Sequence, residues 1–205
     1  LHLLSRRQRQ MCIRDRNGGS LFATGESSLY DEFGEPLKDF ALGDLFKAHL
    51  KNDRLKVSNK TLHTYLRLTP EIRANIYGPQ TGTEPGITGE RHAILKGFEQ
   101  TDILPFGGEL WPLQVDANAD VLMTFIPEFP IYPPETAWMR EPKTDIPGLI
   151  LNTLSNGSRI VYMPADIDRQ FARYNLPDHG NLLSNIIKWT LKDELPIVVS
   201  GPGLI

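Results

Sequence analysis

Two short apolar runs separated by an Asn-Gly turn dominate the C-terminal third of the chain. The runs 149–151 and 160–162 flank residues 155–158, which contain Asn156 and Gly157. Asn-Gly between two apolar runs is the strongest short-range signal of a β-hairpin, because the tight turn requires residues that tolerate positive φ. The pattern therefore predicts a hairpin whose register is fixed by its turn.

An abrupt change from apolar to acidic residues follows the second run, where Met163-Pro164 gives way to Asp166 and Asp168. Such a change is typical of the carboxyl edge of an α/β sheet, where ligands tend to bind. Farther on, apolar residues recur at helical spacing and predict an amphipathic helix over 181–192. These residues are Leu182, Leu183, Ile186, Ile187 and Leu191.

The rest of the chain alternates strand-like and helix-like patterns. Short strands are predicted near 20–24, over 61–68 and over 121–126, and the last is apolar enough for a central strand. Asp39 is placed to cap a helix over 40–49, and a Gly- and Pro-rich loop is expected over 78–97. Together these elements predict an α/β three-layer sandwich with a hairpin near the C-terminus.

Composition indicates an ordinary globular domain of 205 residues, 40% hydrophobic and 23% charged. The net charge of −3, with no basic stripe after residue 20, argues against nucleic acid or an anionic membrane as a partner. No apolar run approaches the roughly 18 residues of a membrane span. The single cysteine, Cys12, excludes an internal disulfide, and a cytoplasmic location is favoured.

The two ends differ in character from the body of the chain. Residues 1–16 are rich in arginine, lack periodicity and resemble a translated sequencing adapter, so we predict a non-native tail; a disordered basic arm is the alternative. Residues 17–194 form the predicted domain. Residues 195–205 are interpreted as the start of a following β domain.

Several segments together resemble a known family. The most specific are Ser-Ser-Leu-Tyr-Asp at 27–31, Pro-Ile-Tyr-Pro-Pro-Glu-Thr at 130–136 and Tyr-Met-Pro-Ala-Asp-Ile-Asp at 162–168. The chain resembles the glutamine-amidotransferase-like domain, or β-galactosidase trimerisation domain, of bacterial glycoside hydrolases. The resemblance implies a flavodoxin-like sheet in a non-catalytic domain, with the hydrolytic carboxylates in a separate TIM barrel.

The elbow after the first strand is the expected place for a catalytic nucleophile. A class I glutamine amidotransferase needs a cysteine there, and this elbow offers only the hydroxyls of Ser27 and Ser28. The Gly-x-Ser-x-Gly spacing of serine hydrolases is broken at Leu29. Turn or capping roles are therefore favoured for both hydroxyls, and nucleophilic catalysis is the alternative.

His179 is the candidate base, with Asp178 beside it in sequence, although a histidine that caps a helix or meets a carboxylate is far commoner. Asp31, Asp166, Asp168 and Asp178 form a predicted polar edge. Asp166 and Asp168 suit helix capping better than metal binding. The other histidines lack metal-ligand spacing, and no metal or cofactor is predicted.

The Pro-rich stretch 127–147 is long for a connection within a compact domain. It carries Tyr132, Glu135, Trp138 and Arg140, which suit a sugar face or a subunit interface. The alternative is a loop folded back onto its own domain, with Trp138 as a plug.

These observations lead to three hypotheses. The first is a non-catalytic accessory domain of a glycoside hydrolase, which acts in assembly and shapes the rim of the barrel active site, with carbohydrate and a homo-oligomer as partners. The second is a stand-alone hydrolase that uses Ser27 or Ser28 with His179. The third is a carbohydrate-binding module.

Overall fold

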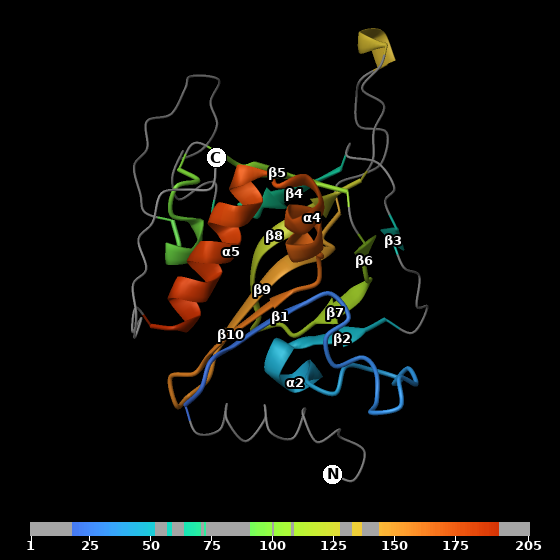
Figure 1. Cartoon of the computed structure of the whole chain (residues 1–205), viewed down its shortest axis with the longest axis vertical. Coiled ribbons are helices and arrows are strands. Elements are labelled where there is room, and N and C mark those ends of the chain that lie inside the picture. The colour runs from blue at the N-terminus through green and yellow to red at the C-terminus, as the bar shows by residue number, and fades with distance from the viewer. Residues whose placement is uncertain are drawn as a thin grey trace.

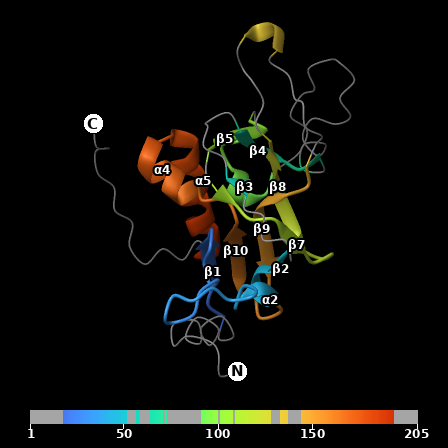
Figure 2. The same cartoon turned by 90° about the vertical axis from the view of Figure 1, so that its right-hand side faces the viewer.

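The computed structural model describes residues 18–51, 57–58, 64–70, 72, 91–99, 101–107, 109–127, 133–136 and 144–192. A six-stranded sheet in the order β1-β10-β9-β8-β4-β5 organises them (Figure 1). Its strands are β1 (Leu21–Thr24), β4 (Thr64–Leu68), β5 (Ile103–Phe106), β8 (Asp120–Ile126), β9 (Pro147–Thr153) and β10 (Arg159–Met163). The sheet curls into an open half-barrel (Figure 2).

Smaller elements surround this sheet. Two-stranded ribbons join β2 (Ala48–Leu50) to β7 (Leu113–Val115) and β3 (Val57–Ser58) to β6 (Glu109–Leu110). The described helices are α2 (Gly43–Phe46), α4 (Ile167–Tyr174) and α5 (Pro177–Thr190), with 3-10 turns η1 (Ala93–Leu95) and η2 (Pro134–Thr136). Of the described helices, none is long and apolar enough to cross a membrane.

Alternation along β10 creates two hydrophobic cores, because successive side chains of a strand point to opposite faces. Val161 and Met163 pack with α4, α5 and η1 on one face. Ile160 and Tyr162 pack on the other face with α2 and the β2–β7 ribbon, where Tyr162 stacks on Phe46 with ring centres 4.2 Å apart. The central strands are therefore buried on both sides.

The predicted flavodoxin-like three-layer sandwich is wrong. Only β1 and β10 are parallel in the main sheet, and its other four neighbouring pairs are antiparallel. Parallel neighbours need helical crossovers, whereas the described chain passes from β9 to β10 through a tight turn. Among the described residues, the face opposite α4 and α5 is covered by the single turn of α2, the β2–β7 ribbon and the segment before α2. The described part of the sheet is therefore not sandwiched between two layers of helices.

Some local predictions were confirmed. The hairpin forms between β9 and β10, where Leu154 N–H donates to Ser158 O and Gly157 has φ 79°. The run at 121–126 lies within β8, an interior strand between β9 and β4. Local apolar patterns and turn chemistry were sufficient in both cases.

Other local predictions need correction. The helix predicted over 40–49 is reduced to α2, because Lys47 adopts the left-handed conformation and the next residues pair with β7 as β2. The last predicted helix begins earlier, at Pro177, and its apolar stripe is narrower because Ile187 and Leu191 are exposed. The expected loop over 78–97 contains η1, which buries Ile94 and Leu95.

The predicted domain boundaries are not tested. Residues 1–17 and 193–205, which include the predicted tail and the predicted following domain, lie outside the described residues. These boundaries stay predictions.

Candidate functional site

The elbow after β1 holds both candidate nucleophiles in structural contacts. Ser27 Oγ donates to the carbonyl oxygen of Thr24 at 2.6 Å. Ser28 Oγ accepts from the backbone N–H of Leu42 at 3.3 Å, and Ser28 has φ 69°, an uncommon conformation for a non-glycine residue. The two hydroxyls fasten the elbow to itself and to the segment before α2, in agreement with the turn role favoured by the sequence.

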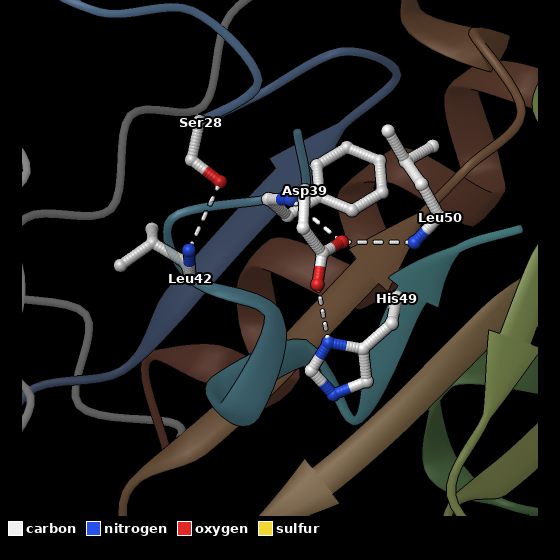
Figure 3. Close-up of polar contacts among 6 residues, drawn as sticks. Ser28, Asp39, Leu42, His49 and Leu50 are labelled. Carbon is white, nitrogen blue, oxygen red and sulfur yellow. Dashed lines mark hydrogen bonds and ion pairs between the residues drawn. The ribbon is translucent and has the colours of Figure 1, made fainter. Parts of the chain in front are cut away.

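A second polar cluster lies beside this elbow, centred on Asp39 (Figure 3). Asp39 Oδ1 accepts from the N–H groups of Phe40 and Leu50, each at 2.8 Å. Asp39 Oδ2 lies 2.7 Å from Nδ1 of His49. Leu50 belongs to β2. The carboxylate therefore accepts from an N–H group of β2 that does not donate to β7.

Electrostatics of this cluster favour the ionised carboxylate. Partial burial opposes ionisation of Asp39, but the hydrogen bonds from Leu50, His49 and Phe40 outweigh it and lower the pKa of Asp39. The carboxylate fixes the His49 ring through Nδ1, and about a third of the His49 side chain is exposed. A carboxylate-oriented histidine is half of the arrangement used in general-base catalysis.

Ser28 does not supply the nucleophile that would complete a catalytic triad with Asp39 and His49. In Figure 3 the Ser28 hydroxyl points to Leu42, and His49 lies on the opposite side of Asp39. The geometry therefore assigns Asp39 and His49 to fastening the β2 strand rather than to a Ser-His-Asp triad. Sequence reasoning missed this pair because it placed both residues at the ends of one long helix.

The carboxyl edge of β1 and β10 brings together two of the predicted acidic residues. Thr24 Oγ1 donates to Asp168 Oδ2 at 2.9 Å, which joins the end of β1 to the first turn of α4. Asp166 is the N-cap residue of α4, but its side chain makes no capping hydrogen bond and instead lies 3.5 Å from Arg169 Nη1. The expected capping role of the Asp166 side chain is therefore wrong.

The other two acidic residues of the predicted polar edge do not join this contact. Asp31 Oδ1 accepts from the N–H groups of Phe33 and Glu35 within its own loop. Asp178 is exposed in the first turn of α5. Across the described ranges, no group of three His, Cys, Asp or Glu side chains is arranged to hold a metal ion.

His179 lies in the first turn of α5. It is 1% exposed, and its Nε2 lies 2.8 Å from the carbonyl oxygen of Pro105 in β5. Burial lowers the pKa of His179, and its hydrogen bond to Pro105 and the charge of Asp178 offset this only in part. A neutral, buried imidazole that joins α5 to β5 is a packing element.

A pocket of about 520 Å³ opens between α5 and η1. Its lining combines ammonium, amide and indole groups, and no prediction from the sequence placed a site there. The lining residues are Ala93, Lys96, Gly97, Asn181, Asn185, Lys188 and Trp189. Polar residues at helical spacing along 181–189 were visible in the sequence, but their partner η1 was not.

The predicted aromatic loop is only partly described. Glu135 lies in η2 and is exposed. Tyr132, Trp138 and Arg140 lie outside the described residues, so the predicted amphipathic patch stays a prediction.

Comparisons with known proteins give structural neighbours alone. No family model matches the sequence, and no curated protein matches it. The fold is similar to that of Cytoplasmic Protein STM1381 from Salmonella typhimurium LT2, with a TM-score of 0.53 and 13% identity. It is also similar to Cytoplasmic Protein STM3548 from Salmonella typhimurium, with a TM-score of 0.52 and 15% identity.

Each alignment covers 89% of this chain and 60% of the other, so the chain spans less than two thirds of either neighbour's length. At these identities the likeness concerns the fold alone.

Proposed function

We propose that this chain is a non-catalytic accessory domain of a larger, cytoplasmic glycoside hydrolase. The observation that carries the non-catalytic part is the use of Ser27, Ser28 and His179 in structural hydrogen bonds. A nucleophile needs a base within hydrogen-bond reach. The two serine hydroxyls and the His179 ring instead form hydrogen bonds with backbone groups of this domain. The three residues therefore hold the elbow and α5 in place.

The proposed parent activity is supported by sequence, through the motifs at 27–31, 130–136 and 162–168. The structure does not have the flavodoxin-like fold that this resemblance implied, so the parent class rests on the motifs alone. The location is supported by the two structural neighbours, which are both described as cytoplasmic proteins.

The turnover test uses the purified chain. We expect no hydrolysis of glutamine, of p-nitrophenyl acetate or of aryl glycosides above the buffer rate. Ser27→Ala and Ser28→Ala variants serve as matched controls, because each removes one hydroxyl at the elbow. Turnover that disappears in either variant would instead support the stand-alone hydrolase.

The parent protein is tested at the level of the gene. The intact reading frame is expected to encode a glycoside-hydrolase catalytic domain in the same polypeptide. An intact frame that begins with a start codon near Asn17 and encodes no catalytic domain contradicts the proposal and favours an independent carbohydrate-binding module.

A further inference from the structure

The pocket between α5 and η1, here called the α5–η1 pocket, has one wall built by a regular helical stripe. Asn181, Asn185, Lys188 and Trp189 follow one another at spacings of four, three and one, which places them along one side of α5. The opposite wall is the turn that follows η1, at Lys96 and Gly97. A volume of about 520 Å³ lies within the range typical of small-molecule sites.

Hydrogen bonds between the two walls organise the pocket in advance of any ligand. Asn185 Nδ2 donates to the carbonyl oxygens of Ile94, at 3.1 Å, and Lys96, at 2.7 Å. Both amide protons are used in this way, and Oδ1 of Asn185 accepts no hydrogen bond from a described residue. The Oδ1 atom of Asn185 is therefore available at the pocket lining to accept a hydrogen bond from a ligand.

The indole of Trp189 is also held in place. His92 contacts it edge-on with ring centres 5.0 Å apart, and the Arg159 guanidinium lies over one face of the indole, 4.9 Å from its centre. Arg159 Nη1 in addition donates to the carbonyl oxygen of Trp189 at 2.7 Å. A fixed aromatic ring binds an apolar ligand surface with little loss of side-chain entropy on binding.

The ionisable side chains that line this pocket are both positively charged. Its lining contains the ammonium groups of Lys96 and Lys188 and no carboxylate, although the chain as a whole has a net charge of −3. Neither ammonium forms an ion pair with a described residue, although the charge of Lys96 lies near enough to the Glu99 carboxylate to add to the hydrogen bond from Gly97 in lowering the pKa of Glu99. The nearby carboxylate of Glu99 accepts from the N–H of Gly97 at 2.8 Å and is not part of the lining.

We propose that the α5–η1 pocket binds a hexose-sized carbohydrate that carries a carboxylate or phosphate group. The indole face that Arg159 does not cover suits the apolar face of a sugar ring. Asn181 and Asn185 suit the hydroxyl groups of the sugar, and the two lysines suit its anionic group. This site is independent of the elbow and of His179, so it stands even if the accessory-domain proposal fails.

Binding is tested by calorimetry on the 205-residue chain with D-glucuronate, D-galacturonate, D-glucose 6-phosphate, D-glucose and inorganic phosphate. At least one acidic sugar is expected to bind, with D-glucose and inorganic phosphate each weaker by about tenfold or more, the range of one charge-assisted hydrogen bond. Affinity for the acidic sugar should fall as NaCl is added, because salt screens exposed charges. Binding of D-glucuronate or D-galacturonate would indicate that the pocket recognises a carboxylate, and binding of D-glucose 6-phosphate would indicate that it recognises a phosphate.

Variants connect any binding to the pocket. Lys188→Gln and Lys96→Gln should each lower the affinity of the chain for the acidic sugar by about tenfold. Lys192→Gln is the matched control, since this exposed lysine near the end of α5 is outside the lining. The affinity of this variant for the acidic sugar should equal that of the unaltered chain. Thermal melting of each variant checks that it is folded.

Several outcomes overturn the proposal. One is that none of the three acidic sugars binds. A second is that inorganic phosphate binds as tightly as they do, which indicates an anion site without sugar recognition. A third is that Lys192→Gln lowers affinity as much as Lys188→Gln, which locates the binding elsewhere.

Discussion

Asp39 Oδ2 lies 2.7 Å from His49 Nδ1, and this contact joins the segment before α2 to the first strand of the β2–β7 ribbon. The same carboxylate accepts from Leu50 N–H in β2 and from Phe40 N–H beside it. Gly43 lies directly under the histidine, because a Cβ there would come within 2.8 Å of His49 Nδ1. Asp39 therefore organises the layer that covers Tyr162 and Ile160.

Asp39→Ala should destabilise the chain, because it removes the acceptor of two backbone donors and the partner of His49. We expect a loss of about 1–3 kcal/mol in the free energy of unfolding, measured by urea denaturation. Asp44→Ala is the control, since Asp44 is an exposed acidic residue of α2, and its effect should stay within about 0.5 kcal/mol. If the loss caused by Asp39→Ala is as small as that caused by Asp44→Ala, the Asp39 cluster adds nothing to stability.

Ser28 allows its hydroxyl and its backbone conformation to be separated. Ser28→Ala loses the acceptor for Leu42 N–H and keeps a side chain at φ 69°, whereas Ser28→Gly loses the acceptor but removes the conformational strain. Ser28→Ala should therefore be less stable than Ser28→Gly, by about 1 kcal/mol. Thermal melts of the two variants decide the order, and the reverse order would contradict a left-handed Ser28.

Acid should destabilise the chain partly through His179. Burial lowers the pKa of His179 below its ordinary value of 6.5, so at pH values between the folded and unfolded pKa the unfolded chain binds more protons. The stabilising contribution is then complete above about pH 6.5 and is lost as the pH falls toward the folded pKa. His92, whose pKa burial also lowers, acts in the same direction.

His179→Gln tests this pH dependence, because a glutamine amide can donate to the Pro105 carbonyl and does not titrate. Its stability should fall less than that of the unaltered chain between pH 7.5 and 5.5, whatever the absolute stability of the variant. Parallel pH profiles of the two proteins would show that His179 does not titrate on unfolding in this range.

Gly148→Ala should be poorly tolerated in β9. A Cβ at this position would lie 2.6 Å from Cδ2 of Leu66, which is fully buried in β4. Overpacking of this kind costs about 1–3 kcal/mol. Combination with Leu66→Ala should recover part of the loss, because the new methyl group fills space that the leucine vacates, and strictly additive effects in the double-mutant cycle would refute the contact.

The sequence by itself determined features that depend on neighbouring residues. Asn156-Gly157 between two apolar runs was enough for the β9–β10 hairpin, and the run 121–126 was enough for an interior strand. Turn geometry and side-chain alternation act within a few residues, so they leave a readable local pattern. The helical stripe of α5 was likewise visible, although its start and its exposed positions were not.

Only the tertiary structure decided how these pieces meet. An apolar strand pattern shows that a strand is buried but not which strand lies beside it or in which direction, so β1 beside β10 and the antiparallel remainder escaped prediction. Asp39 and His49 meet because β2 pairing ended the predicted helix early. The α5–η1 pocket joins Asn185 to Ile94, 91 residues apart, and such long-range contacts are selected by packing rather than by any local signal.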